Sequence, residues 1–243
     1  GDRIGHIRRI DGHHVAVRYA MRYGNPSMAS QLEELKELGI GGTALGTGIN
    51  SHPKFASAIV KELSNLCEIK FKETKNKFAT TSSHTVFLCT AGALKSLALD
   101  LNKIANDLKL LGSGPRTGFG EITLPEVQPG SSIMPGKVNP SIPECITMIC
   151  AQVVGNEHTV EFSCNEGHLQ LNTMCPIIMY NLLWSIQILT NGLSMFRTKC
   201  IDGIKANEDR IKELYDGSLC EATSLVKKLG YDKVAKMVKE GKL

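Results

Sequence analysis

The residues best suited to chemistry gather in one short stretch, 130–144, which reads GSSIMPGKVNPSIPE. Its Gly and Pro residues break both the helical and the strand pattern, so the stretch is predicted to be a loop. Ser131 and Ser132 offer hydroxyls, Lys137 offers a cation, and Asn139 offers an amide that donates and accepts hydrogen bonds. This set suits an anionic substrate that carries carboxylates. The alternative for such a loop is a plain surface connection.

Two glycine patterns imitate nucleotide-binding motifs but do not satisfy them. Five residues separate Gly130 from Gly136, where a Walker A loop needs four, and Val138 replaces the Ser or Thr that would hold magnesium. The G-x-G-x-x-A pattern at Gly39 follows a helix-like run, so the strand that a dinucleotide fingerprint requires is missing. Neither pattern is therefore interpreted as a nucleotide site.

The 130–144 loop resembles the shared motif of the fumarase/aspartase superfamily, G-S-S-x-M-P-x-K-x-N followed by a Glu. Every fixed position is present, and Glu144 is the following Glu. The run GGTALGTGIN at 41–50 resembles the family's second conserved block, and residues 93–122 resemble its central helix and the turn after it. The resemblance extends from Gly39 to about Gly230.

This resemblance implies a reaction and a role for each loop residue. In the family, a four-carbon dicarboxylate undergoes reversible elimination to give fumarate. Ser131 would be the base that takes the proton next to a carboxylate, and Glu144 would orient a catalytic His. Backbone N–H groups of the loop would stabilise the enediolate that forms. The predicted substrate-binding residues are Ser132, Lys137, Val138 and Asn139.

Two parts of the family pattern are missing from the printed chain. The family's Thr-His-Leu-Gln-Asp block, which supplies the His, is not found upstream of 41–50. His6, His13 and His14 are candidate replacements, although surface histidines in a divergent arm are the favoured interpretation. The family's N-terminal domain is also absent, so we expect a fragment or a natural truncation. A catalytically incomplete structural or interaction protein of the same fold therefore stays as the alternative to an enzyme.

The residues around 167–175 bear on the substrate. Aspartases resemble this chain more closely than fumarases do over GHLQLN, because fumarases tend to have Phe-Glu where Leu169 and Gln170 stand. Cys175 departs from both groups. The resemblance therefore favours aspartate ammonia-lyase, which converts L-aspartate to fumarate and ammonia, over fumarate hydratase.

Segments with helical periodicity flank the loop. The best is Thr85–Leu111, where apolar residues recur at spacings of three and four and Gly112 follows. These residues are Leu94, Leu97, Leu101, Ile104, Leu108 and Leu111. Further helices are predicted at about 53–66, 143–160, 177–196, 207–227 and 231–239. The predicted fold class is all-α, an elongated bundle of long helices with an abbreviated C-terminal helical part.

The predicted domains are a divergent N-terminal arm, a central helical bundle with a mobile loop, and a truncated C-terminal helical domain. They cover 1–30, 31–204 with the loop at 130–140, and 205–243. A heptad seam as long as that of 85–111 is expected to pack against further helices. The resemblance implies a homotetramer, in which three subunits contribute to each active site.

Composition excludes several other classes of protein. The chain is 42% hydrophobic and 21% charged with a net charge of +4, and its basic residues do not form a block with interleaved aromatics. Nucleic-acid binding is therefore not indicated, and no apolar run is long enough for a membrane span. The eight Cys form no C-x-x-C pair and are interpreted as reduced core residues of an intracellular protein. We expect no metal or cofactor, and a cytoplasmic location, or a mitochondrial one in a eukaryote.

Other polar residues receive structural interpretations. Residues 67–84 are expected to form polar surface, with His84 as a cap or surface residue. Arg116 and Glu121 are expected to tie down the turn at GSGPRTG rather than bind a carboxylate. The glycines of 39–50 are expected to allow close packing, and Thr43, Thr47 or Asn50 is the alternative as a site-lining residue.

Overall fold

The structure is a computed structural model, and it describes residues 32–114, 116–130 and 133–241. Predictions for residues 1–31, 131 and 132 lie outside the described residues. The described residues form two compact units, one with those up to Asn106 and Ser141–Asp202, and the other with those of Asp107–Pro140 and from Gly203 onward. The 130–140 loop thus belongs with the C-terminal part of the chain, and the three-domain division stays a prediction.

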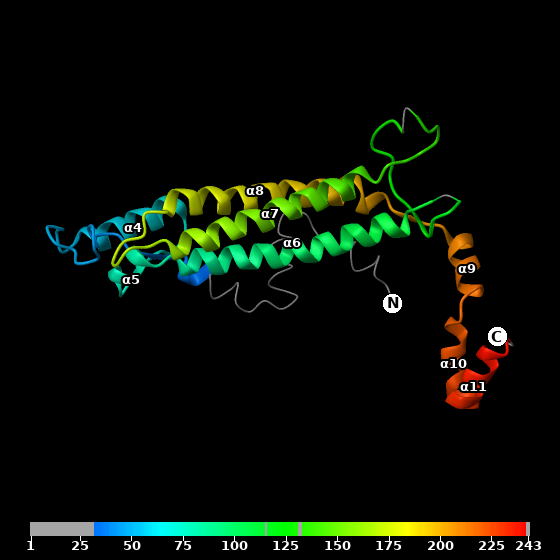
Figure 1. Cartoon of the computed structure of the whole chain (residues 1–243). Helices are drawn as coiled ribbons and strands as arrows, with labels where there is room; N and C mark the ends of the chain where they lie inside the picture. Colours follow the sequence, from blue (N-terminus) through cyan, green and yellow to red (C-terminus); the bar gives the residue numbers. More distant parts are fainter. Residues whose placement is uncertain (1–31, 115, 131–132, 242–243) are drawn as a thin grey trace. The chain divides into compact units, whose positions relative to one another are not determined.

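Three long helices make up most of the first unit. They are α6 (Thr85–Leu111), α7 (Ser141–Asn165) and α8 (Cys175–Lys199), and they run side by side in Figure 1. The bounds of α6 are those that the sequence predicts, and both other helices extend beyond theirs. The described residues otherwise contain short helices and two-residue strands. The prediction of an all-α bundle is confirmed.

The seam of α6 is buried, but not at every predicted position. Leu94, Leu97, Leu101 and Leu108 are buried, whereas Ile104 and Leu111 are half-buried. Ala105 is 0% exposed and occupies the seam next to Ile104. A straight α-helix has about 3.6 residues per turn, more than the 3.5 of a strict heptad repeat, so the buried stripe drifts off its seam over several turns.

Helices α7 and α8 approach each other closely at Gly192. A Cβ placed there would lie 2.6 Å from Cδ1 of Ile149, so the absence of a side chain lets Ile149 pack against the backbone of α8. In α8, Leu182, Leu189, Leu193 and Phe196 are buried, whereas Ile186 is 42% exposed.

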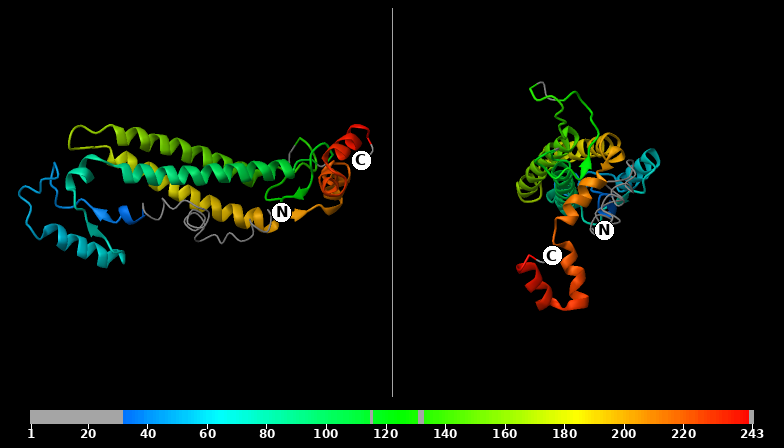
Figure 2. Two further views of the ribbon diagram at one scale, coloured as in Figure 1. Left: turned by 90° about the horizontal axis from the view of Figure 1, so that it is seen from below. Right: turned by 90° about the vertical axis from the view of Figure 1, so that its right-hand side faces the viewer.

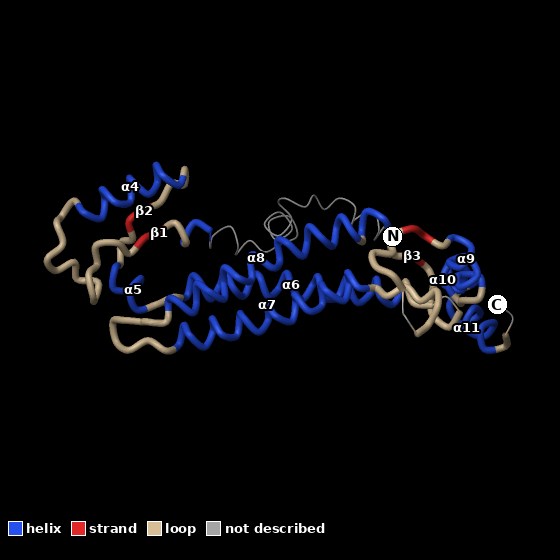
Figure 3. The backbone as a smooth tube through the Cα atoms, turned by 90° about the horizontal axis from the view of Figure 1, so that it is seen from above, coloured by secondary structure: helices blue, strands red, loops and turns tan. Residues whose placement is uncertain are grey.

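Smaller elements stand at one end of the bundle, as Figure 3 shows. Strand β1 (Glu37–Leu38) pairs in parallel with β2 (Lys72–Glu73), so the helix-like run before Gly39 does not continue as a helix to Leu38. Helix α4 (Phe55–Cys67) agrees with its prediction, and α5 (Lys77–Ser82) was not predicted. Asn76 caps α5 by accepting the N–H of Ala79 at 3.1 Å, a signal that the polar character of the segment concealed.

The second unit contains the chain that leads into the 130–140 loop, the loop, and the C-terminal helices. Strand β3 (Ile122–Thr123) pairs antiparallel with β4 (Lys205–Ala206), which follows the 3-10 turn η1 (Ile201–Gly203). Where a pair of helices was predicted, three occur: α9 (Glu208–Asp216), α10 (Cys220–Leu229) and α11 (Tyr231–Lys239). Gly217 ends α9, and α10 and α11 fold back on each other in Figure 2.

The cysteines are free thiols, but most are not core residues. Cys150 and Cys200 are buried, and this burial raises the pKa of each thiol to about 11. Cys67, Cys89 and Cys220 are exposed, so for them the core interpretation is wrong. Among the described helices, none is both long and apolar enough to span a membrane.

Candidate active site

The described part of the predicted substrate loop presents polar groups to solvent. Lys137 and Val138 are exposed, and Asn139 is half-buried. The loop narrows where Gly130 meets Lys137, because a Cβ on Gly130 would stand 2.6 Å from the Lys137 carbonyl oxygen. The Lys137 N–H donates to the Met134 carbonyl at 3.2 Å. Ser131 and Ser132 lie outside the described residues, so their roles stay predictions.

Glu144 stands in the first turn of α7, as the sequence predicts. Its side chain is exposed, and its main-chain carbonyl accepts the hydroxyl of Thr147 at 2.7 Å. A carboxylate is favourable at a helix N-terminus because unpaired N–H groups gather there. Glu144 belongs to the first unit and the 130–140 loop to the second.

Asn207 holds the chain that leads into the loop, and the sequence did not reveal it. Its side-chain amide donates to the Gly120 carbonyl at 2.7 Å, and its side-chain oxygen accepts the Thr123 hydroxyl at 2.9 Å. Its backbone N–H donates to the Glu121 carbonyl at 2.9 Å. Asn207 precedes α9 as its N-cap, yet its side chain makes no capping bond to that helix. An Asn before a helix usually signals a cap, which is why the pattern concealed this contact.

Arg210 binds the neighbouring part of the same turn. Its Nε donates to the Phe119 carbonyl at 3.0 Å and its Nη2 to the Gly118 carbonyl at 3.4 Å. The guanidinium group that binds the turn is thus that of Arg210, whereas Arg116 within the turn is exposed. Glu121 has a structural role through its main chain, because its N–H donates to the Leu111 carbonyl at 2.9 Å.

His84 was expected to be a cap or surface residue, and the surface interpretation is wrong. It precedes α6, where its carbonyl accepts the N–H groups of Phe87 and Leu88, but its side chain is buried. Its Nε2 lies 3.3 Å from the carbonyl oxygen of Asn172, and Asn172 donates in turn to the Ser163 carbonyl at 3.1 Å. This contact ties the turn between α7 and α8 to the start of α6.

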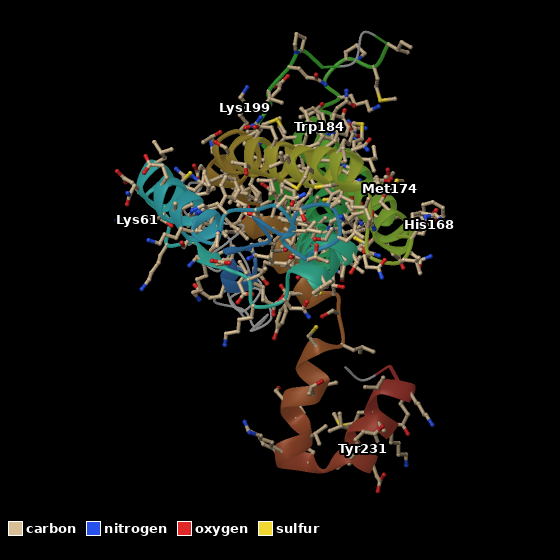
Figure 4. The ribbon with its side chains drawn as sticks, turned by 90° about the vertical axis from the view of Figure 1, so that its left-hand side faces the viewer. Lys61, His168, Met174, Trp184, Lys199 and Tyr231 are labelled. Carbon is tan, nitrogen blue, oxygen red and sulfur yellow. The ribbon has the colours of Figure 1, made fainter. Side chains whose placement is uncertain are left out.

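The turn that His84 supports carries the GHLQLN residues that sequence reasoning used for substrate choice. His168 and Leu171 form a single antiparallel bridge, and Leu169 at the tip has a φ of 51° and is 92% exposed. Figure 4 shows the His168 side chain at the edge of the bundle, pointing away from the helices. In this chain these residues form an exposed turn.

The glycine-rich run 39–50 packs closely, as expected. A Cβ on Gly46 would lie 2.6 Å from the backbone nitrogen of Phe78. Thr43 and Asn50 have positive φ values of 57° and 61°, and the Thr47 hydroxyl accepts the N–H of Ile49 at 3.3 Å. Thr47 is therefore used within its own turn. Within the described ranges, no cluster of three His, Cys, Asp or Glu side chains could hold a metal ion.

Comparison with known proteins decides the family. A family model described as a lyase matches residues 11–155, more than half of the chain. The chain belongs to the fumarase/aspartase superfamily. The fumarate hydratase class II of Halalkalibacterium halodurans is 48% identical to this chain over 85% of this chain's length. That of Methylorubrum extorquens is 47% identical over 89% of it.

Solved structures of the superfamily agree with the fold. A fumarate lyase:delta crystallin from Brucella melitensis, described as bound to cobalt, superimposes with a TM-score of 0.85 at 42% identity, over 91% of this chain and 48% of that one. A class II fumarase from Schistosoma mansoni gives a TM-score of 0.84 at 37% identity, over 88% of this chain and 48% of that one. The chain spans 45% and 46% of the two curated relatives named above.

Proposed function

We propose that this superfamily member serves as a fumarate hydratase, which interconverts L-malate with fumarate and water. The supporting observation is that the relatives at 47% to 48% identity are named fumarate hydratase class II. Their aligned regions cover 85% to 89% of this chain. This replaces the preference for aspartate that rested on GHLQLN, because these relatives are named for the hydratase reaction.

The proposed reaction begins with removal of a proton. In the malate direction, Ser131 takes the proton from the carbon next to one carboxylate, and the electron pair moves into that carboxylate to form an enediolate. The electrons then return to form the double bond as the hydroxyl leaves the neighbouring carbon. That hydroxyl takes up a proton and departs as water. Glu144 acts through a His that supplies this proton, for which His6, His13 and His14 remain the candidates in the printed chain.

The exposed polar groups of the loop suit the binding of the substrate carboxylates. Lys137 supplies the cation, and Asn139 and the backbone at Val138 supply hydrogen bonds. A cation and N–H donors aimed at the enediolate stabilise the charge that develops in the transition state. Ser132 is proposed to bind beside them. No metal or cofactor enters this proposal.

Self-association is part of the proposal, and the outer face of α8 supports it. Ile177, Tyr180, Leu183 and Trp184 are exposed there, opposite the stripe that packs within the bundle. Trp184 projects from the outer side of α8 in Figure 4. A helix that is apolar on opposite faces is normally covered on both. We propose that copies of this chain cover that face, as in a homotetramer in which several subunits contribute to each site.

The test is the appearance of fumarate, followed by ultraviolet absorbance, after L-malate or L-aspartate is added in separate samples. The proposal expects fumarate from malate alone, and expects Lys137→Met to abolish most of the rate. Lys75→Met, at an exposed lysine distant in sequence from the loop, is the matched control and should leave the rate unchanged. Fumarate from aspartate alone would show an ammonia-lyase instead. A folded oligomer that yields fumarate from neither substrate would contradict an enzymatic role for this chain.

A further inference from the structure

The contacts in the second unit connect α9 to the chain segment that leads into the loop carrying Lys137. Asn207 and Arg210 bind the turn at 118–123 through its carbonyls and the Thr123 hydroxyl. Strand β3 at the end of that turn pairs with β4, immediately before Asn207. The side chains of Asn207 and Arg210 therefore hold the turn, and the pairing of β3 with β4 holds its C-terminal end.

The path continues through two close contacts after β3. Leu124 packs against Gly112, where a Cβ would lie 3.3 Å from its Cγ atom. Pro125 packs against Gly203, where a Cβ would lie 2.6 Å from the Pro125 Cγ atom. The contact at Gly203 leaves no room for a side chain and the one at Gly112 is tight, so the chain entering the loop packs against residues on either side of it.

The path ends at the neck of the loop, where Gly130 lies against Lys137. Gly130 lies so close to the Lys137 carbonyl that a Cβ could not be accommodated without a shift. Beyond the neck, Lys137 and Val138 are exposed, and the Lys137 N–H donates to the Met134 carbonyl at 3.2 Å. The neck joins this segment to the chain that Asn207 and Arg210 hold.

The chemistry of Asn207 indicates that this attachment is its role. An Asn at the N-cap usually accepts an N–H of its own helix, which stabilises the helix by about 1 kcal/mol. Here the side chain forgoes that bond and makes two bonds to residues more than 80 positions earlier, to Gly120 and Thr123. Arg210, one turn further along α9, likewise directs two donors at Gly118 and Phe119.

We infer that Asn207 and Arg210 are positioning residues, which hold the loop in place so that Lys137 and Asn139 can bind the substrate. This inference rests on the proposed function for its consequence in catalysis, but not for the contacts themselves. It assigns the first turn of α9 a task in the proposed reaction, although neither residue would touch the substrate.

The test measures loop position without the need for activity. Trypsin cleaves after Lys137, and a protease requires several residues of locally free chain. Asn207→Ser keeps a good N-cap residue for α9 but is too short to bridge to the turn, and Arg210→Lys keeps the charge but loses the paired donors. Each variant should speed cleavage of the Lys137–Val138 bond by about fivefold to tenfold, as expected for the loss of one or two hydrogen bonds.

Three further variants serve as controls and calibrate the size of the effect. Glu213→Gln breaks the ion pair that Arg210 Nη1 makes at 2.6 Å and leaves the bonds to the turn, so cleavage at Lys137 should not change. Gly130→Ala opens the neck directly and should speed cleavage without altering hydrogen exchange at 118–123. Asn207→Asp keeps the acceptor for Thr123 and loses the donor to Gly120, so an intermediate effect is expected.

Hydrogen exchange separates this role from a general loss of stability. In Asn207→Ser and Arg210→Lys, amides of 118–123 should exchange faster while those of α7 and α8 stay protected. Unchanged cleavage at Lys137 in both variants, despite faster exchange at 118–123, would overturn the inference. Where malate turnover is measurable, both variants should raise KM for malate. Faster cleavage in a protein without any turnover would support the positioning role and count against the proposed function alone.

Discussion

Lys95 of α6 and Glu157 of α7 form an ion pair of 2.7 Å across the bundle. The Glu157 side chain is 8% exposed, whereas the Lys95 side chain reaches partly into solvent. The hydrogen bond to Glu157 raises the pKa of Lys95. The pair connects two helices that are far apart in sequence, and Glu157 is the more deeply placed of the two partners.

This asymmetry predicts unequal effects of removing either partner. Lys95→Met leaves a buried carboxylate without its cation and should lower the free energy of unfolding by about 2–3 kcal/mol, less than for a fully buried pair. Glu157→Gln leaves a lysine that solvent can reach and should cost about 1 kcal/mol. Urea unfolding at pH 7 measures both values. The interpretation would be wrong if Glu157→Gln cost more than Lys95→Met.

Two glycines in the same bundle predict opposite effects of one added methyl group. Gly192→Ala places a Cβ against Ile149 and should destabilise the protein by about 1–2 kcal/mol, through overpacking between α7 and α8. Gly155→Ala meets nothing within 4 Å and should stabilise α7 by about 0.5–1 kcal/mol. Thermal unfolding followed by circular dichroism compares them. Combining Gly192→Ala with Ile149→Val should restore part of the loss.

The buried thiols predict a loss of stability at alkaline pH. Burial raises the pKa of Cys150 and of Cys200 from 9.0 to about 11. Because the folded state holds these protons more tightly, their contribution is complete below pH 9 and is lost as the pH rises from 9 through 11. The urea midpoint of the Cys150→Ala/Cys200→Ala variant should therefore depend less on pH in that window. Cys220→Ala, at an exposed thiol, should leave the dependence as it is.

The lone Trp of the chain reports directly on the proposed association face. Trp184 is 45% exposed in one copy, so association should shift its fluorescence to shorter wavelength and protect it from acrylamide. Tyr180→Glu, one turn earlier on the same face, should weaken association and reverse both effects. Sedimentation velocity gives the oligomeric state independently. A stable monomer with quencher-accessible Trp184 would contradict the proposed assembly.

Helical periodicity predicted the long helix α6 well but did not predict how the C-terminal helices are divided. The spacing of Leu94, Leu97, Leu101 and Leu108 located α6 to its ends, because a long apolar stripe terminated by glycine has few other interpretations. The division of the C-terminal helices was missed because Gly217 is flanked by residues that also suit a helix.

Some residues of the candidate site could be predicted from the sequence, and others could not. The loop motif and Glu144 were visible because their residue types are chemically distinctive over a short span. His84 and Asn207 were missed because their partners, Asn172 and Gly120, lie more than 80 positions away in the sequence. A pattern read along one chain gives no sign of such contacts, and each residue suited a commoner local role.

The most direct test of the account is Ser131→Ala, measured on the malate reaction of the assembled protein. Loss of the base should lower kcat by about 10³-fold, with unchanged circular dichroism and sedimentation. Ser96→Ala, on the exposed side of α6, removes a hydroxyl that bonds only to its own helix at Gly92 and should keep full activity. Unchanged turnover in Ser131→Ala would contradict the assignment of the 130–144 loop as the catalytic loop.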